Sequence, residues 1–367
     1  MKLLHCSDLH LGRRLHGAPL LEDQRAVLNQ ILALAQTEAV DAVLLAGDLY
    51  DKPVPPVEAV GLLDWFLTEL SRLGCAVLAV SGNHDSPERL AFAASLLGTS
   101  RVYLAPAFEG AAPPVRLEDR FGPVDFYLLP FLKPVHVRRV YPEAELETYT
   151  DAVAQVLSHW TLDPEARNVL LAHQLVTGSV RSESETISIG GMDHVDAEAF
   201  GGFDYVALGH LHRAQDVGPG LRYAGSPLAY SFSEGGQEKS VTLVELGEKG
   251  NVAVTARPLT PLHPVRSLRG GLEDLLEGES EDYLRITLTG GDLPNSFARL
   301  QSRYPNLLKL EYAQGPAGAL PEAETLPVQS PEALLAAFYE SRWEEPLSED
   351  QWALARRLME EIWEDGL

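Results

Sequence analysis

The chain has 367 residues, of which 45% are hydrophobic and 22% are charged, a composition typical of folded globular proteins and not of disordered or fibrous ones. Its 53 acidic and 29 basic side chains give a formal net charge of −24. This charge argues against non-specific binding to nucleic acid or to anionic membranes, because such binding depends on cationic side chains.

The apolar stretches of the sequence are short. Those at residues 42–46 and 76–80 fall well below the roughly 20 residues that a membrane-spanning helix needs, and the N-terminus becomes polar too early for a signal peptide. Cys6 and Cys75 are too few for a disulfide framework, so we expect buried free thiols. These features predict a cytoplasmic protein with no membrane segment.

Short apolar runs alternate with amphipathic stretches from residue 1 to about residue 265. Residues 21–39 and 57–73 carry apolar side chains at helical spacing. The apolar runs are bounded by Gly, Asp or Asn, as in strands that are buried on both faces; they cover residues 3–6, 42–46, 76–80, 126–129, 169–172 and 205–208. This alternation predicts a layered α/β domain. Residues 241–246 and 252–256 look like a hairpin added to a sheet edge.

The composition changes after the prolines of residues 258–264. We expect residues 266–325 to form a small unit with a strand at 284–289, a helix at 295–303 and a strand at 307–312. Residues 315–327 are rich in turn formers and are expected to form a linker.

The last segment, residues 328–367, is predicted to form two short helices. Ser330-Pro331 begins the first, and Ser348 to Gln351 fit a capping box for the second. The apolar face of the second helix either packs on the protein's own core or docks on a partner protein. It contains Trp352, Ala355, Leu358, Met359, Ile362 and Trp363.

Polar side chains follow five of the predicted strands. Ligands bind beyond the carboxyl ends of strands in open α/β sheets, so we expect these side chains to converge. Alternate residues of an extended chain point to the same side, so Asp8 with His10, and His210 with His212, would each form a two-pronged ligand, whereas the neighbours Asn83 and His84 would point apart. The candidate metal ligands are Asp8, His10, Asp48, Asn83, His173, His210 and His212.

Seven ligands exceed the four positions of a zinc-like site and suit two ions bridged by one carboxylate, for which Asp48 is the natural candidate. Imidazole and carboxylate donors without thiolate suit Mn²⁺, Fe²⁺ or Zn²⁺ better than Ca²⁺ or Cu⁺. A lone histidine near a strand end is more often structural, which is our interpretation of His5, His16, His136, His159, His194 and His263.

The order of these motifs resembles that of the calcineurin-like metallophosphoesterases, and within them the double-strand-break repair nucleases. The motifs are Asp8-x-His10, Gly47-Asp48-x-x-Asp51, Gly82-Asn83-His84-Asp85, His173 and Gly209-His210-x-His212. The resemblance implies a four-layer α/β/β/α phosphoesterase domain over residues 1–265, a small α+β capping domain over residues 266–325 that helps to hold DNA, and a C-terminal helical element over residues 328–367 that docks on a coiled-coil ATPase.

The resemblance also implies a metal-dependent DNA nuclease, acting as a double-strand exonuclease and a single-strand or hairpin endonuclease in DNA end processing, repair and recombination. Two divalent ions, with Mn²⁺ expected, would supply the attacking hydroxide. His84 would face the substrate and protonate the leaving 3′ oxygen, with Asp85 orienting it. Asp51 fits either this site or a cap on the turn after Asp48. Dimerisation through residues 55–100, within a heterotetramer, is a further family property.

For DNA contact, the first candidates are Arg13, Arg14 and Arg89, and no base-reading motif is visible, so selectivity should be for DNA ends and hairpins. For partner contact, the candidates are Trp352, Leu358, Met359, Ile362 and Trp363. Two alternatives compete. A small-molecule phosphodiesterase or phosphatase of the same fold would not need the residues after the catalytic domain, and a non-catalytic scaffold would not need the complete set of metal and acid positions.

Overall fold

The computed structural model describes residues 1–182, 185, 193–290, 295–313, 335–336, 339–340, 346–349 and 351–356. The chain divides into two compact units, one of residues 1–186 and 194–315 and one of residues 187–193 and 316–367. Cys6 and Cys75 are buried free thiols, as predicted. No helix among the described residues is both long and apolar enough to cross a membrane.

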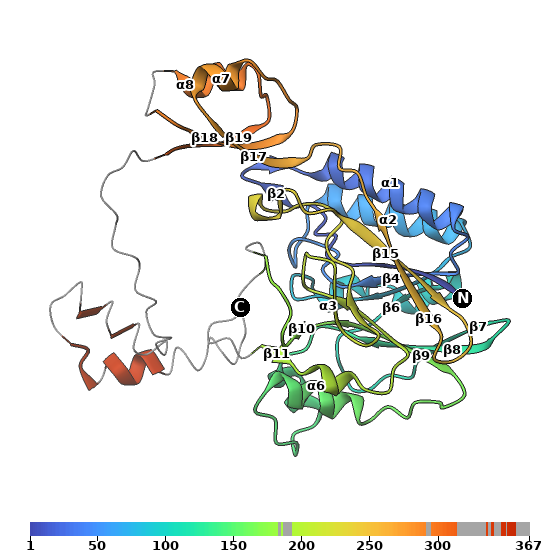
Figure 1. Ribbon diagram of the computed structural model, residues 1–367. Helices are drawn as coiled ribbons and strands as arrows, with labels where there is room; N and C mark the ends of the chain where they lie inside the picture. Colours follow the sequence, from blue (N-terminus) through green and yellow to red (C-terminus); the bar gives the residue numbers. More distant parts are fainter. Residues whose placement is uncertain are drawn as a thin grey trace. The chain divides into compact units, whose positions relative to one another are not determined.

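The first sheet of the described residues has six strands in the order β16-β15-β1-β4-β5-β6 (Figure 1). The strands β1, β4, β5 and β6 run parallel to one another. β15 pairs antiparallel with β1, and β16 pairs antiparallel with β15 at the edge, which confirms the predicted hairpin. The bounds are β1 Lys2–Cys6, β4 Ala42–Ala46, β5 Ala76–Val80, β6 Val102–Leu104, β15 Ser240–Leu246 and β16 Val252–Pro258.

The second sheet of the described part also has six strands, in the order β13-β14-β12-β9-β8-β7. The strands β8, β9 and β12 were expected from their apolar runs, whereas the edge strands β7 and β13 and the neighbouring β14 were not, because they are short or largely polar. The bounds are β7 Val115–Asp119, β8 Gly122–Leu129, β9 Arg167–His173, β12 Tyr205–Gly209, β13 Gln215–Gly218 and β14 Leu221–Tyr223.

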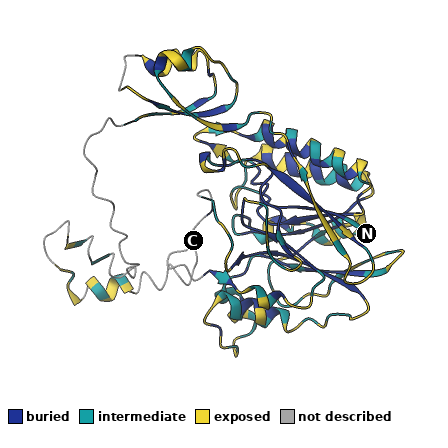
Figure 2. Cartoon of the chain, viewed as in Figure 1, coloured by how far each residue is buried: buried dark blue, intermediate teal, exposed yellow. Residues whose placement is uncertain are grey.

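The two sheets pack face to face and helices cover their outer faces. Val124 and Phe126 of β8 lie in one core with Leu44 of β4. The helices α1 (Leu21–Thr37) and α2 (Val57–Arg72) pack on the first sheet, whereas α5 (Pro134–Val140) and α6 (Tyr149–Leu157) pack on the second. Figure 2 shows buried strands between helices whose outer surfaces are exposed. This is the four-layer α/β/β/α arrangement that the resemblance implied.

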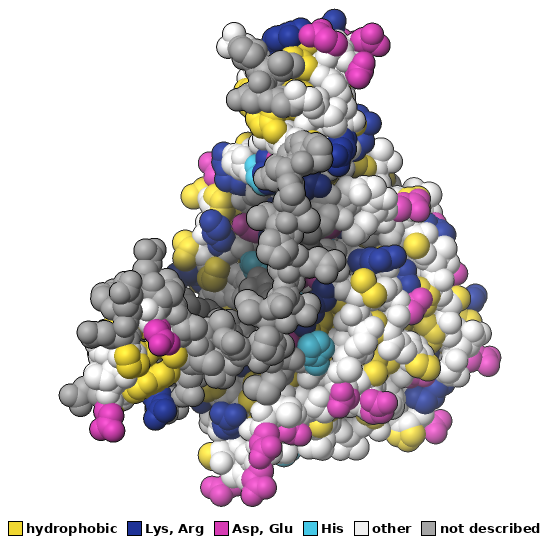
Figure 3. Space-filling model, turned by 60° about the vertical axis from the view of Figure 1, so that its left-hand side comes forward, with side chains coloured by type: hydrophobic (Ala, Val, Ile, Leu, Met, Phe, Trp, Pro, Cys, Tyr) yellow, Lys and Arg dark blue, Asp and Glu magenta, His cyan; other side chains and the backbone are white. Residues whose placement is uncertain are grey.

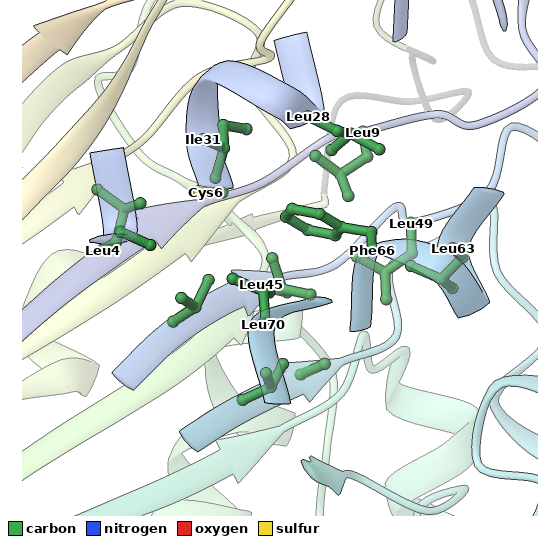
Figure 4. Packing of buried hydrophobic residues seen from close by; sticks show 14 of the residues in the cluster. Leu4, Cys6, Leu9, Leu28, Ile31, Leu45, Leu49, Leu63, Phe66 and Leu70 are labelled. Atoms are coloured by element: carbon green, nitrogen blue, oxygen red, sulfur yellow. The ribbon is translucent and has the colours of Figure 1, made fainter. Parts of the chain in front are cut away.

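The core between α2 and the first sheet is built around Phe66, which is fully buried. Its ring lies among Leu9, Leu45 and Leu49 (Figure 4). Burial of one large apolar side chain contributes about 1.5–3 kcal/mol, so this layer anchors the loops that leave β1 and β4.

Short elements connect the layers. They are β2 Arg14–Leu15, β3 Ala18–Pro19, α3 Pro87–Leu90, α4 Ala94–Leu97, β10 Leu175–Val176 and β11 His194–Val195, with 3₁₀ turns η1 Gly98–Ser100, η2 Ala197–Phe200 and η3 Phe232–Glu234.

The described residues between 265 and 313 form a parallel sheet in the order β17-β18-β19, with two short helices. The predicted strand, helix and strand appear within two residues of their expected bounds, whereas β17 and α7 were missed. The exposed, polar pattern of β17 gives it no strand signal. The bounds are β17 Val265–Gly270, α7 Leu272–Leu276, β18 Tyr283–Leu288, α8 Ser296–Gln301 and β19 Leu307–Tyr312.

In the C-terminal segment the predicted capping box is confirmed. The Gln351 backbone N–H donates to Ser348 Oγ over 3.3 Å, and the Ser348 N–H donates to Gln351 Oε1 over 2.9 Å. Trp352 is half-buried. The other candidate partner contacts, Leu358, Met359, Ile362 and Trp363, lie outside the described residues, as does Ser330-Pro331.

Candidate metal centre

The carboxyl ends of β1, β4, β5, β9 and β12 meet, and they bring the seven candidate ligands together. His173 Nε2 and His210 Nδ1 each lie 3.0 Å from Asn83 Oδ1. His10 Nε2 lies 3.1 Å from His212 Nε2. The expected convergence of five strand ends is therefore present in the fold.

Asp48 lies at the centre of the cluster. Its Oδ2 is 3.6 Å from His10 Nε2 and 3.5 Å from His173 Nε2. Among the described residues, three groups place their ligand atoms within 4.8 Å of one another: Asp8, His10 and His212; Asp8, Asp48 and His173; and His10, Asp48 and His84. Asp8, His10 and Asp48 are each shared by two groups.

The donor set fits divalent cations. Asp8 and Asp48 are 0% and 2% exposed, and two buried carboxylates need compensating positive charge. His10 Nδ1 is buried and has no hydrogen-bond partner among the described residues. Carboxylate, imidazole and amide oxygen donors together suit first-row divalent metals.

The backbone of the cluster is strained. Asp8, His10, Asp48 and His210 have φ values of 54°, 42°, 51° and 109°, in regions that residues other than glycine rarely adopt. We predicted that Asp8 and His10 converge as alternate residues of extended chain. They do converge, but this reasoning was wrong, because both lie in left-handed turns.

The loops after β1 and β4 brace each other through backbone hydrogen bonds. The Asp8 N–H donates to Gly47 O over 3.0 Å, and the His10 N–H donates to Asp48 O over 2.9 Å. A third loop closes on them at Gly82, where a Cβ would lie 2.1 Å from Asp48 Oδ1. Only glycine therefore fits at this point.

Burial and charge act in opposite directions on the titratable groups. Burial would lower the pKa of His173, but Asp48 and Asp8 raise it to about 9. Burial would raise the pKa of Asp48, yet His173 and His10 hold it well below its usual range. Burial raises the pKa of Asp8. The cluster thus keeps a central carboxylate ionised within a low-dielectric environment.

The structure corrects the role expected of Asp85. Its carboxylate accepts hydrogen bonds from the backbone N–H groups of Leu49, Tyr50 and Gly82 over 2.9–3.1 Å. His84 Nδ1 instead lies 3.0 Å from the Asp51 carbonyl oxygen. Asp85 therefore ties two ligand-bearing loops together and does not orient His84, because its two oxygens face the main chain.

Asp51 occupies the space between the metal cluster and Arg13. Its Oδ1 lies 3.0 Å from Arg13 Nη1 and 3.7 Å from His10 Nδ1. The guanidinium of Arg13 also stacks over the Tyr230 ring at 5.3 Å. Asp51 thus contacts the site through its side chain as well as orienting His84 through its main chain.

The candidate DNA contacts differ in their surroundings. Arg13 is turned towards Asp51, whereas Arg14 is exposed and donates to Gly17 O. The Arg89 guanidinium donates to Pro53 O over 2.7 Å. Figure 3 shows Lys and Arg side chains scattered among neutral and acidic ones on the visible face.

Sequence reasoning missed two residues that support the ligands. Gln24 of α1 is 1% exposed, and its Nε2 donates to the His10 carbonyl oxygen over 2.7 Å. Its signal was a polar residue within the apolar stripe of a helix. Glu234 lies 3.1 Å from His212 Nδ1 through its Oε1. His5, in contrast, is structural as predicted, with Nδ1 2.9 Å from Tyr205 Oη.

Comparison with known proteins identifies the class of protein to which the chain belongs. Residues 1–214 match the family described as calcineurin-like phosphoesterase, and residues 261–342 match the type 5 capsule protein repressor C-terminal domain. A crystal structure of a dimetal phosphatase from Danio rerio is similar with a TM-score of 0.40 and 12% identity, over 71% of this chain and 97% of that chain.

Two relatives, both SbcD components of the nuclease SbcCD, match over nearly their whole length. The one from Staphylococcus epidermidis is 31% identical over 96% of both chains, and the one from Staphylococcus saprophyticus is 32% identical over 100% of both. The chain belongs to the calcineurin-like phosphoesterases, a family of metal-dependent phosphoester hydrolases, and within it to the SbcD nucleases.

Proposed function

We propose that this protein is a two-metal DNA nuclease that cleaves phosphodiester bonds at DNA ends and hairpins, as a homodimer in a heterotetramer with an SbcC-like ATPase. The observation that carries the proposal is the convergence of seven buried or half-buried metal-ligand side chains from five strand ends. Full-length similarity to SbcD nucleases supports it.

In this proposal Asp48 would be shared by two divalent ions, which we take to be Mn²⁺. Asp8, His10 and His212 would hold one, as their proximity suggests. Asn83, whose Oδ1 contacts both His173 and His210, would help to hold the other. Bound ions would lower the pKa of water and neutralise charge on the phosphoryl oxygens.

Two residues of the chain, His84 and Asp51, are proposed to assist departure of the leaving group. The Asp51 carbonyl oxygen, 3.0 Å away, accepts a hydrogen bond from the His84 Nδ1–H and sets the ring's orientation. The protonated ring then carries a second proton on Nε2, which it donates to the leaving 3′ oxygen. Arg14 and Arg89, both at the surface, are proposed to contact the DNA backbone.

Cleavage of linear and hairpin DNA with Mn²⁺ tests the nuclease proposal. His84→Ala should lower the rate about 10²–10⁴-fold, the usual contribution of a general acid. The matched control is His159→Ala, which removes an exposed ring stacked on Tyr141 and should cleave like the wild type. A wild type that leaves DNA intact but hydrolyses cyclic nucleotides would instead establish the small-molecule phosphodiesterase alternative.

We further propose that residues 266–325 cap the site and that residues 328–367 dock on the ATPase. Deleting residues 328–367 should leave basal metal-dependent cleavage and abolish binding to the ATPase in a pull-down. Retained binding would refute the docking role.

A further inference from the structure

A buried carboxylate faces the ring of the candidate ligand His212. Glu234 is 0% exposed and its Oε1 lies 3.1 Å from His212 Nδ1. An ionised carboxylate can only accept hydrogen bonds, so Nδ1 carries the ring proton. The lone pair then lies on Nε2, the atom that is 3.1 Å from His10 Nε2 within the cluster.

A buried lysine completes this arrangement. Lys239 is 6% exposed, and its Nζ lies 2.5 Å from Glu234 Oε2. The same ammonium donates to the His212 carbonyl oxygen and to Ser226 Oγ, each over 3.0 Å. Glu234 therefore holds the ring of His212 while Lys239 holds its main chain.

Lys239 supplies the positive charge that a buried carboxylate needs. Its ammonium lies 2.5 Å from Glu234 Oε2, and both side chains are buried. A buried ion pair is by itself weak evidence for a role in stability or function. Here, however, one oxygen of the carboxylate contacts Lys239 and the other contacts Nδ1 of His212, the ring nitrogen that faces away from the cluster. Partners at this position commonly set the tautomer and the basicity of a metal-binding histidine.

We propose that Glu234 and Lys239 are positioning residues that lock His212 in the Nδ1–H tautomer and present its Nε2 lone pair to a divalent cation. The inference rests on the proposed assignment of His212 as a metal ligand.

The tautomer is measured first, in the metal-free wild type. Imidazole ¹⁵N chemical shifts, assigned by loss of the signal in His212→Gln, should show the Nδ1–H form. An Nε2–H form would overturn the inference whatever the metal affinity.

The second test removes both charges while it keeps the side-chain shapes. In Glu234→Gln/Lys239→Met the amide can either donate or accept, so His212 should populate both tautomers. Mn²⁺ affinity measured by calorimetry should fall about 10- to 100-fold, as is usual when such a partner is lost.

The matched control is Asp119→Asn/Arg167→Met, which removes a different largely buried ion pair and should bind Mn²⁺ like the wild type. An equal loss in this control would show that the effect is one of general stability and would overturn the inference. Unchanged affinity and tautomer in Glu234→Gln/Lys239→Met would overturn it alone. A wild type that binds no Mn²⁺ would overturn the proposed function as well.

Discussion

Replacing Gln24 with methionine removes the support of the loop that carries Asp8 and His10. The Gln24 side chain joins α1 to this loop through three contacts: Nε2 donates to His10 O over 2.7 Å and to Leu9 O over 3.2 Å, and Oε1 accepts from the Gly12 N–H over 3.0 Å. Methionine has a similar length and shape but cannot make these hydrogen bonds.

The expected loss of stability depends on which backbone groups lose their only hydrogen-bond partner when Gln24 is replaced. Leu9 O keeps its hydrogen bond from Tyr230 Oη, and His10 O keeps that from the Arg13 N–H. Within the described part of the chain, the Gly12 N–H is left without an acceptor. One such group costs about 1–3 kcal/mol, so we expect a loss of about 2 kcal/mol and a Tm lower by about 4 °C. Because Asp8 and His10 are held in strained conformations, we also expect Mn²⁺ affinity to fall about tenfold.

The same helix offers a matched control in Gln30, whose side chain makes two hydrogen bonds to the Thr260 main chain far from the cluster. Gln30→Met should leave Mn²⁺ affinity unchanged and destabilise less, because water can replace these half-exposed contacts. Circular dichroism measures Tm and calorimetry measures Mn²⁺ binding. If Gln24→Met bound Mn²⁺ as tightly as Gln30→Met does, the loop would not depend on this support.

Three further perturbations have defined outcomes. Phe66→Ala should cost about 3–5 kcal/mol in urea unfolding, because the ring is fully buried, whereas Phe92→Ala, at a side chain that is 82% exposed, should cost little; equal losses would contradict the packing described. Gly82→Ala should abolish tight Mn²⁺ binding, since its Cβ would lie 2.1 Å from Asp48 Oδ1, and near-normal affinity by calorimetry would disprove this constraint. Burial would raise the pKa of Asp119, but Arg167 and the N-terminal amine hold it below the ordinary 3.8. The stability from Asp119 is therefore present above pH 3.8 and lost as the pH falls through the lowered pKa. Asp119→Asn should be less stable than the wild type at pH 7 but approach it in strong acid, and a constant difference would refute this.

The layered α/β fold followed from the sequence because its signals are local. A strand buried on both faces must be apolar throughout, as in residues 42–46, and a helix with one buried face must repeat its apolar residues, as in residues 57–73. The edge strands lacked such signals. One side of an edge strand such as β13 meets solvent, and this strand has no apolar run.

The seven candidate ligands were also predictable, because each ends a strand or follows one within four residues and parallel strand ends share one edge of a sheet. Tertiary structure alone decided how they are held. The left-handed turns at Asp8 and His10 depend on backbone hydrogen bonds to the loop after β4. The Asp85 carboxylate accepts hydrogen bonds from three backbone N–H groups of two loops, and these contacts decide its structural role.

The supporting residues could be recognised only in the fold. The position of Gln24 in an apolar helix stripe marks it as unusual but does not reveal its partners, and the partners that Gln24 and Glu234 meet are 14 and 22 residues away in the chain. The sequence by itself determined which side chains could bind metal, because residue type sets donor chemistry. Only the folded structure decided their conformation and their neighbours, because both depend on contacts between segments that are distant in sequence.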